Sequence, residues 1–291
     1  MTSIIVCNAG SDSLSIIDLK TKSVISVEYS LCEKPIGPHN MKKIGDKIIT
    51  ANSYNDSVSI YEVNKFKELY NIKVGTNPND IVLLDNILYT ACGDLNAVNV
   101  HDINTREILW SIATGSWPHS IDYSNFSKNL YVSNIEENTV DIISEVDKKK
   151  IGEIVAKEYP TKVKVSLDNK YIYVCESYLG SDNGGYIEVF DLRNNKSIAR
   201  VKVGNAPMDI YEDSENLYVA NFTDGTISIL TKKELKVINT IYVGGMPRGI
   251  IANDSKIYVI DYLKGNLIEI ENESKKNIIA IGMEPIAMML L

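Results

Sequence analysis

The sequence predicts an all-β chain built from seven copies of one four-stranded unit, and two repeating frames support this. Seven of the eight prolines recur at intervals of 38 to 47 residues: Pro38, Pro78, Pro118, Pro160, Pro207, Pro247 and Pro285. The third residue after each of these prolines is apolar, and a second frame of the type Tyr-Val-x-Asn follows in step. Repetition at this period indicates a repeat architecture. Four short strands in about 41 residues form one propeller blade, so the fold class is a seven-bladed β-propeller with antiparallel blades.

Each strand of the unit has its own signature. The innermost strand starts at the repeat proline, a position where the missing N–H removes no interior ladder hydrogen bond. The second strand is the Tyr-Val frame, as in 131–134, and the third is an alternating segment such as 13–18. The fourth strand, such as 237–243, leads into a glycine, and in five units the frame reads Gly-x-x-Pro. β-branched and aromatic residues dominate these runs, as expected for strands.

One four-stranded unit is divided between the two ends of the sequence. The sequence begins with a second strand, at 4–8, and the innermost strand of that unit appears only at 285–290. We therefore predict one domain over 1–291, with one blade split between 1–30 and 285–291. Pairing the two ends closes the ring and removes an exposed sheet edge.

Composition narrows the classes of function. The chain has 30 basic and 38 acidic residues and a net charge of −8, which disfavours binding to nucleic acid or to an anionic membrane. The start of the chain lacks the features of a signal peptide, and the four cysteines form no CxxC pair. We expect a cytoplasmic monomer with reduced thiols. An extracellular location is the alternative if a leader was removed.

The paired frames Tyr-Val-x-Asn (131–134 and 218–221) and Val-Gly-x-x-Pro (243–247) resemble the YVTN-family propellers of surface-layer-like proteins. The resemblance covers essentially the whole chain and implies the seven-bladed fold. It implies little about activity.

The best functional signal lies in the two positions that follow each repeat proline. The strand order places the inter-blade turn and the turn after the second strand on one face, around one mouth of the central channel. The two positions hold mutually different and mostly polar residues: His39-Asn40, Asn79-Asp80, His119-Ser120, Thr161-Lys162, Met208-Asp209, Arg248-Gly249 and Ile286-Ala287. The next position stays apolar, so the scaffold repeats while this ring varies.

Four residues are candidates for catalysis. His39 and His119 occupy the same repeat position with Asp80 between them, which suggests a metal or acid–base site. The competing interpretation is that the imidazoles cap backbone groups or line a wet channel. Glu176 is a longer acidic residue where other units end the second strand with Asn or Asp. No cofactor can be named from these residues, and a divalent metal at the channel mouth is one option.

Ten further residues are predicted to contact a ligand. They combine polar and charged side chains at the variable positions, among them a Lys and an Arg able to bind a carboxylate or phosphate, with aromatic rings on the same face. They are Asn40, Asn79, Trp117, Ser120, Lys162, Tyr178, Asp209, Phe222, Arg248 and Tyr262. For Arg248, Asp209 and Lys162, mutual ion pairing around the mouth is the competing interpretation. The long interval of 47 residues comes from an added loop at 177–185, a common route to function on a rigid scaffold.

These observations favour a binding propeller that holds a small molecule or a protein segment over the channel mouth. One alternative is a hydrolase or lyase of the lactonase-like propeller type, with a His/Asp/Glu site at the channel mouth that works with or without a metal. A structural protein of a surface coat is the other. The fold alone does not choose between them.

Overall fold

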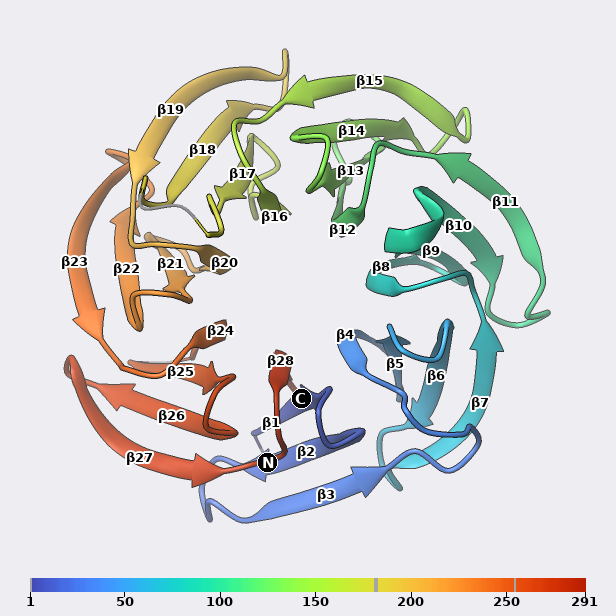
Figure 1. Ribbon diagram of the computed structural model, residues 1–291, viewed down its shortest axis with the longest axis horizontal. Coiled ribbons are helices and arrows are strands. Elements are labelled where there is room, and N and C mark those ends of the chain that lie inside the picture. The colour runs from blue at the N-terminus through green and yellow to red at the C-terminus, as the bar shows by residue number, and fades with distance from the viewer. Residues whose placement is uncertain (1, 181–182, 254) are drawn as a thin grey trace.

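The computed structural model describes residues 2–180, 183–253 and 255–291, and these residues form a ring of seven four-stranded antiparallel sheets (Figure 1). Residues 181 and 182 of the added loop at 177–185 lie outside the described part. Each repeat proline is the first residue of an innermost strand, as the sequence predicts. These strands are β4 (Pro38–Ile44), β8 (Pro78–Leu84), β12 (Pro118–Ser124), β16 (Pro160–Val165), β20 (Pro207–Glu212), β24 (Pro247–Asn253) and β28 (Pro285–Leu290).

The other three strands of each blade follow outward in chain order. The second strands are β1 (Ser3–Asn8), β5 (Lys47–Asn52), β9 (Ile87–Cys92), β13 (Asn129–Asn134), β17 (Tyr171–Glu176), β21 (Asn216–Asn221) and β25 (Lys256–Asp261). The third strands are β2 (Ser13–Asp18), β6 (Ser57–Glu62), β10 (Ala97–Asp102), β14 (Thr139–Ser144), β18 (Tyr186–Asp191), β22 (Thr226–Thr231) and β26 (Asn266–Glu271). The outermost strands are β3 (Val24–Glu28), β7 (Lys67–Lys73), β11 (Ile108–Ala113), β15 (Lys149–Val155), β19 (Lys196–Lys202), β23 (Lys236–Tyr242) and β27 (Ser274–Ala280). A short 3-10 turn, η1 (Gly93–Leu95), follows β9.

The first and last strands close the ring, as the sequence predicts. β28 pairs with β1 in antiparallel register, with Val6 opposite Met288 and Ile4 opposite Leu290. The backbone N–H of Leu291 extends the pairing by donating to the carbonyl of Ser3 at 2.8 Å. In Figure 1 the red β28 lies on the channel beside the blue β1, so the two ends of the chain share one blade.

Apolar side chains between neighbouring blades form the core. Seven buried clusters are present among the described residues, and several draw on the facing sheets of two adjacent blades. Four tyrosines of the second and third strands are among the largest fully buried side chains: Tyr61, Tyr89, Tyr131 and Tyr173. Burial of this apolar area holds the blades at fixed positions around the channel. The described residues contain no helix long and apolar enough to cross a bilayer.

Every innermost strand carries the same irregularity directly after its proline. In β4, Pro38 is opposite Asn52 and Asn40 is opposite Ala51, so His39 is an extra residue in the ladder. The register shifts at the same place in the other six blades. An extra residue of this kind is a β-bulge, which breaks the alternation of side chains and redirects them. The bulge thus gives the residue after each proline an orientation that a regular strand would not.

Candidate functional site at the channel mouth

The seven bulge residues form a ring between two adjoining cavities and line both of them. The channel cavity, of about 410 Å³, runs along the innermost strands. The mouth cavity, of about 400 Å³, lies between that ring and solvent. The ring residues line both cavities, and we call them the first ring: His39, Asn79, His119, Thr161, Met208, Arg248 and Ile286.

The next residue of each blade forms a second ring on the channel side. Its lining members are Asn40, Asp80, Ser120, Lys162, Asp209 and Ala287. The seventh position is Gly249, which has no side chain to offer. The two rings therefore face one channel, and the sequence register places their residues at its mouth.

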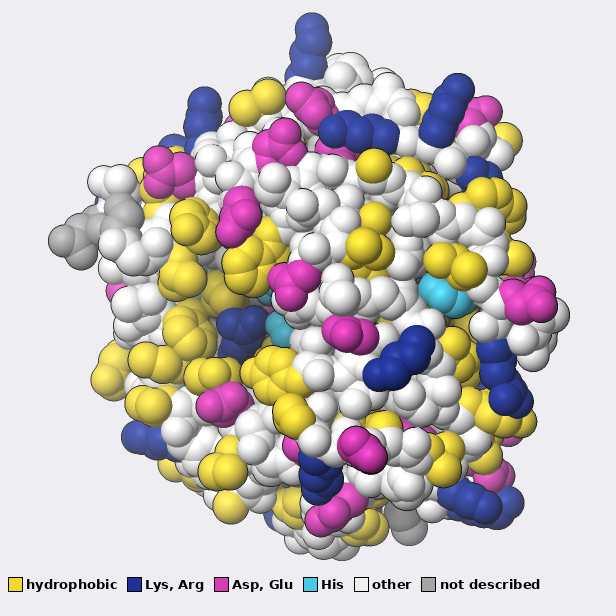
Figure 2. All heavy atoms as spheres, turned by 45° about the vertical axis from the view of Figure 1, so that its right-hand side comes forward, with side chains coloured by type: hydrophobic (Ala, Val, Ile, Leu, Met, Phe, Trp, Pro, Cys, Tyr) yellow, Lys and Arg dark blue, Asp and Glu magenta, His cyan; other side chains and the backbone are white. Residues whose placement is uncertain are grey.

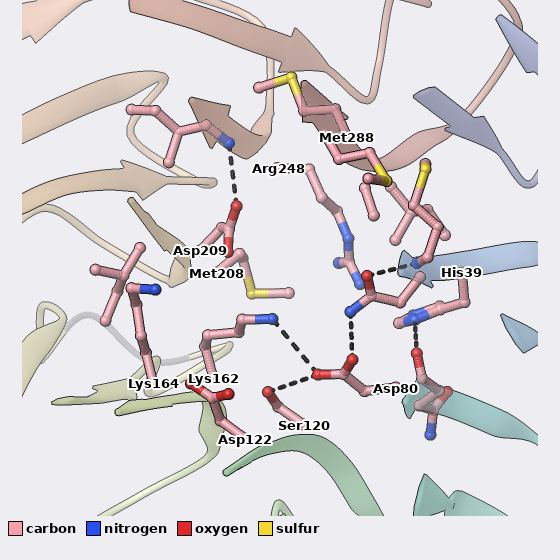
Figure 3. A pocket seen from close by; sticks show the side chains of 18 of the residues that line it. His39, Asp80, Ser120, Asp122, Lys162, Lys164, Met208, Asp209, Arg248 and Met288 are labelled. Atoms are coloured by element: carbon pink, nitrogen blue, oxygen red, sulfur yellow. Dashed lines mark hydrogen bonds and ion pairs between the residues drawn. The ribbon is translucent and has the colours of Figure 1, made fainter. Parts of the chain in front are cut away.

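Asp80 is the hydrogen-bonding centre of the second ring and is 2% exposed. Its carboxylate accepts hydrogen bonds from Asn40 Nδ2 at 2.5 Å and from the Ser120 hydroxyl at 2.9 Å (Figure 3). It also accepts the backbone N–H of Ile121 in the following blade, at 3.1 Å. Asp80 thus connects three consecutive blades. This structural role is sufficient to explain an aspartate at this position.

Lys162 completes this polar network. Its Nζ lies 3.5 Å from Asp80 Oδ2. Burial opposes the charge of Lys162, but the carboxylates of Asp80, Asp209 and Asp122 raise its pKa overall. Despite the burial of Asp80, Lys162 and Lys42 lower the pKa of that carboxyl group. Both groups are consequently charged at neutral pH, and Lys162 is ion-paired with Asp80 rather than with Asp209.

The channel cavity is positive although the chain is acidic. Among the lining residues, five cations (Lys42, Lys43, Lys162, Lys164 and Arg248) face three carboxylates (Asp80, Asp122 and Asp209). The whole chain carries a net charge of −8. A locally positive cavity in an acidic protein concentrates anions and repels cations.

His39 and His119 come together across the first ring, although they are separated by one blade. Their ring centroids are 5.4 Å apart, and the rings are perpendicular. His39 Nδ1 lies 2.7 Å from the carbonyl oxygen of Asn79, and His119 Nδ1 lies 2.7 Å from that of Thr161. Each imidazole is therefore hydrogen-bonded to the backbone of the next blade, and both residues line the two cavities.

Arg248 has no hydrogen bond or ion pair with any other described residue. Its guanidinium lies over the Tyr262 ring, 6.0 Å from the centroid. Burial lowers its pKa, although a guanidinium stays charged in proteins. In Figure 3 the Arg248 side chain extends into the cavity. An uncompensated, partly desolvated cation of this kind is a ready-made site for an anion.

An aromatic and apolar rim surrounds the mouth cavity. Figure 2 shows a hollow bordered by hydrophobic side chains, with basic and histidine atoms in its depth. The rim residues come from both kinds of turn expected on this face: Tyr54, Trp117, Tyr159, Leu179 and Tyr262. Tyr54 is 57% exposed, so these rings offer free apolar surface.

Two of the rim aromatic residues have a backbone conformation that is unfavourable for residues other than glycine. Trp117 has a φ of +55° and Tyr159 a φ of +51°. Large side chains rarely adopt this left-handed conformation, and such residues gather at functional sites. The equivalent residue is Asn77, Ala206 or Glu284 in three other blades, so the scaffold does not require an aromatic ring there.

Three of the predicted site residues lie elsewhere in the structure. Within the described residues, Glu176, Tyr178 and Phe222 line neither cavity. Glu176 is fully buried and pairs with Arg200 Nε at 2.7 Å. Burial, followed by the neighbouring carboxyl group of Glu188, raises the pKa of Glu176 to about 7.

The two aromatic residues of this set have packing partners. The hydroxyl of Tyr178 accepts a hydrogen bond from Arg200 Nη2 at 2.9 Å. The Phe222 ring packs on Tyr262, with centroids 5.7 Å apart. Phe222 therefore supports a rim residue from behind, while Tyr178 belongs to the cluster around Glu176.

The described residues contain no group of three or more His, Cys, Asp or Glu side chains arranged to hold a metal ion. The two histidines would supply two ligands. Asp80 is already engaged with neighbouring donors.

Sequence reasoning missed the deeper part of the channel. The fourth residue after the proline also lines the channel cavity in six blades: Lys42, Asp122, Lys164, Tyr211, Ile251 and Met289. The signal was available, because strand side chains repeat with a period of two and this position follows the second ring by two residues.

Comparison with known proteins supports the fold. No family model matches the chain, and no curated protein matches it. Among solved structures, a functionally unknown protein from Desulfotomaculum acetoxidans DSM 771 superposes with a TM-score of 0.81 at 12% identity, over 99% of this chain and 98% of that one. Kuenenia stuttgartiensis hydrazine synthase gives a TM-score of 0.77 at 16% identity, over 90% and 92%. The dihydro-heme d1 dehydrogenase NirN, in complex with DHE, gives 0.70 at 14%, over 93% and 61%. At these identities the likeness extends to the propeller fold alone.

Proposed function

We propose that this chain is a binding propeller that holds a small organic anion at the mouth of its central channel. The anionic group is bound by Arg248, and the apolar part of the ligand lies against the aromatic rim. This proposal is compatible with membership of the YVTN-type propellers, which we also propose from the repeated sequence frames.

The unpaired guanidinium of Arg248 carries the proposal. Burying a cation without a partner costs free energy, so proteins pair buried charges or use them. Lys162 in the same channel is paired with Asp80, whereas Arg248 forms no hydrogen bond or ion pair with a described residue, and Asp209 attracts it only from beyond ion-pair distance. A planar guanidinium binds a carboxylate through two parallel hydrogen bonds, which suits it to a ligand of this class.

The surroundings support a small amphipathic ligand. The mouth cavity, at about 400 Å³, falls within the range of small-molecule sites. Its lining on the solvent side is mainly aromatic and apolar, with Ser53, Asn77 and the exposed Glu136 as polar members, and the positive channel lies beneath. A molecule with a carboxylate at one end and a ring at the other matches this gradient.

Calorimetric titration with phenylacetate tests the proposal, with phenylacetamide as its neutral counterpart. We expect phenylacetate to bind and phenylacetamide to bind at least about tenfold more weakly, because a charge-assisted hydrogen bond contributes roughly 1.5–3 kcal/mol. Arg248→Met should abolish this preference.

Arg193→Met is the matched control. Arg193 has a 78% exposed side chain, pairs with Asp191 and lies outside both cavities. The Arg193→Met substitution removes the same charge as Arg248→Met and should leave phenylacetate binding unchanged. Equal binding of phenylacetate and phenylacetamide, or equal losses in the two variants, would contradict the assignment of Arg248.

A further inference from the structure

The two histidines of the first ring have the same defined tautomer. A backbone carbonyl oxygen can only accept a hydrogen bond. Because His39 Nδ1 and His119 Nδ1 each lie 2.7 Å from such an oxygen, Nδ1 must carry the proton in both rings. The hydrogen bond made by one ring nitrogen in this way fixes the state of the other.

Both rings are also neutral at physiological pH. Burial lowers the pKa of His119 to about 4, with a further contribution from Arg248. Burial, His119 and Arg248 likewise hold the pKa of His39 well below its usual value. In a neutral ring protonated on Nδ1, the Nε2 atom carries a lone pair and accepts a hydrogen bond. No described residue donates to Nε2 of either histidine, although both residues line both cavities.

The mouth therefore presents one strong donor beside two acceptors. Arg248 offers only donors, and its charge acts on both imidazoles. The two imidazole rings lie 5.4 Å apart between centroids, and both residues line the same two cavities as Arg248. A ligand that satisfies Arg248 and one of the two histidines needs an anionic acceptor and, close to it, one hydrogen-bond donor.

The positive charge near Arg248 decides which kind of hydrogen-bond donor the ligand can carry. An ammonium group would donate, but it would lie beside Arg248 and next to the channel cavity, whose cations outnumber its carboxylates. A hydroxyl group donates without adding charge. The donor that fits is therefore a hydroxyl.

We infer that the ligand is a hydroxy acid, with its carboxylate on Arg248 and its hydroxyl donating to Nε2 of His39 or His119. This inference rests on the proposed function and names the ligand class for the same site. The aromatic rim favours a hydroxy acid that also carries a ring or another apolar group.

Three related acids test the inference by calorimetric titration: mandelate as separate enantiomers, phenylacetate and phenylglycine. They differ only in the substituent next to the carboxylate, which is hydroxyl, hydrogen or ammonium. We expect the better enantiomer of mandelate to bind about three- to tenfold more tightly than phenylacetate, the effect of one added hydrogen bond. Phenylglycine should bind more weakly than phenylacetate.

Variants of the histidines locate the effect. In His39→Asn and His119→Asn, the new amide N–H can still reach the backbone carbonyl, but no acceptor remains where Nε2 stood. The ratio of mandelate affinity to phenylacetate affinity should fall to about one in at least one of them. His101→Phe is the control, since His101 is a buried histidine outside both cavities and the equivalent residue in another blade is Phe190. The comparison of the three acids on the unmodified protein needs no variant, so a variant that fails to fold does not weaken the test.

The outcomes separate the two proposals. If mandelate and phenylacetate bind equally and both depend on Arg248, the hydroxy-acid inference is wrong and the proposed function stands. If phenylglycine binds as tightly as mandelate, the donor is not restricted to a hydroxyl and the inference is again wrong. If none of the acids binds, both proposals fall.

Discussion

The hydroxyl of Ser120 donates a 2.9 Å hydrogen bond to Asp80, the residue at the same repeat position in the preceding blade. Asp80 also accepts from Asn40 and from the backbone of Ile121, and it faces Lys162. Removing the carboxylate leaves several buried or half-buried donors and one half-buried cation without this partner. We predict that Asp80→Ala lowers the free energy of unfolding by about 3 kcal/mol, measured by urea denaturation.

Asp46→Ala is the control for this change, because Asp46 is exposed in the turn between β4 and β5. It should alter the free energy of unfolding by less than about 0.5 kcal/mol. An Asp80→Ala protein as stable as the control would mean that Asp80 does not hold the blades together.

Arg248 should behave in the opposite way. Because its guanidinium has no ionic partner among the described residues, replacing it removes a desolvated charge and breaks no hydrogen bond. We predict that Arg248→Met leaves the free energy of unfolding unchanged or raises it by up to about 1 kcal/mol, as expected for residues kept for function. Thermal melting of the ligand-free protein measures this. A loss of 2 kcal/mol or more would instead assign Arg248 a structural role.

Glu176 should make stability depend on pH. Its pKa in the folded chain is raised to about 7, first by burial and then by Glu188. Between its ordinary value near 4.5 and about 7, the folded chain holds a proton that the unfolded chain has lost. The resulting stabilisation is complete below this window and is lost as the pH rises through it.

Glu176→Gln cannot titrate at this position, so the free energy of unfolding of this variant should not fall as the pH rises through this window. Urea denaturation between about pH 5 and pH 8 should show the wild type losing about 1–2 kcal/mol relative to the variant as the pH rises. Parallel stability curves for the two proteins would show that Glu176 titrates normally.

Closure of the ring makes a further prediction. Deleting residues 285–291 removes β28 and exposes both the ladder edge of β1 and the apolar cluster around Ile4 and Val6. We predict that the shortened chain loses its cooperative thermal transition in circular dichroism. Deletion of residues 1–2 spares every strand and should leave the transition in place. A shortened chain that melts like the wild type would contradict closure through β28.

The sequence was informative about register and much less so about orientation. The repeat prolines predicted where each innermost strand begins, because proline tolerates that position and few others in a sheet. They also predicted that the following two residues face one mouth. The β-bulge that turns both residues toward the channel follows the proline in every blade, but the bulge residue itself gives no sign of it, since His39, Met208 and Ile286 all occupy that position.

Glu176 illustrates the limit of such reasoning. Its place at the end of β17 indicated the face on which it lies but not the direction of its side chain. That direction depends on Arg200, which stands on β19, two strands away in the same blade. Contacts across a sheet depend on the pairing register, and a single sequence without alignment gives that register only approximately.

A crystal structure of the protein with mandelate tests the central claim most directly. We predict the ligand carboxylate on the guanidinium of Arg248, the hydroxyl within hydrogen-bonding distance of Nε2 of His39 or His119, and the phenyl ring against the rim of Tyr54, Trp117, Tyr159 and Tyr262. A ligand bound elsewhere on the propeller, with the first ring contacting only solvent, would contradict the account.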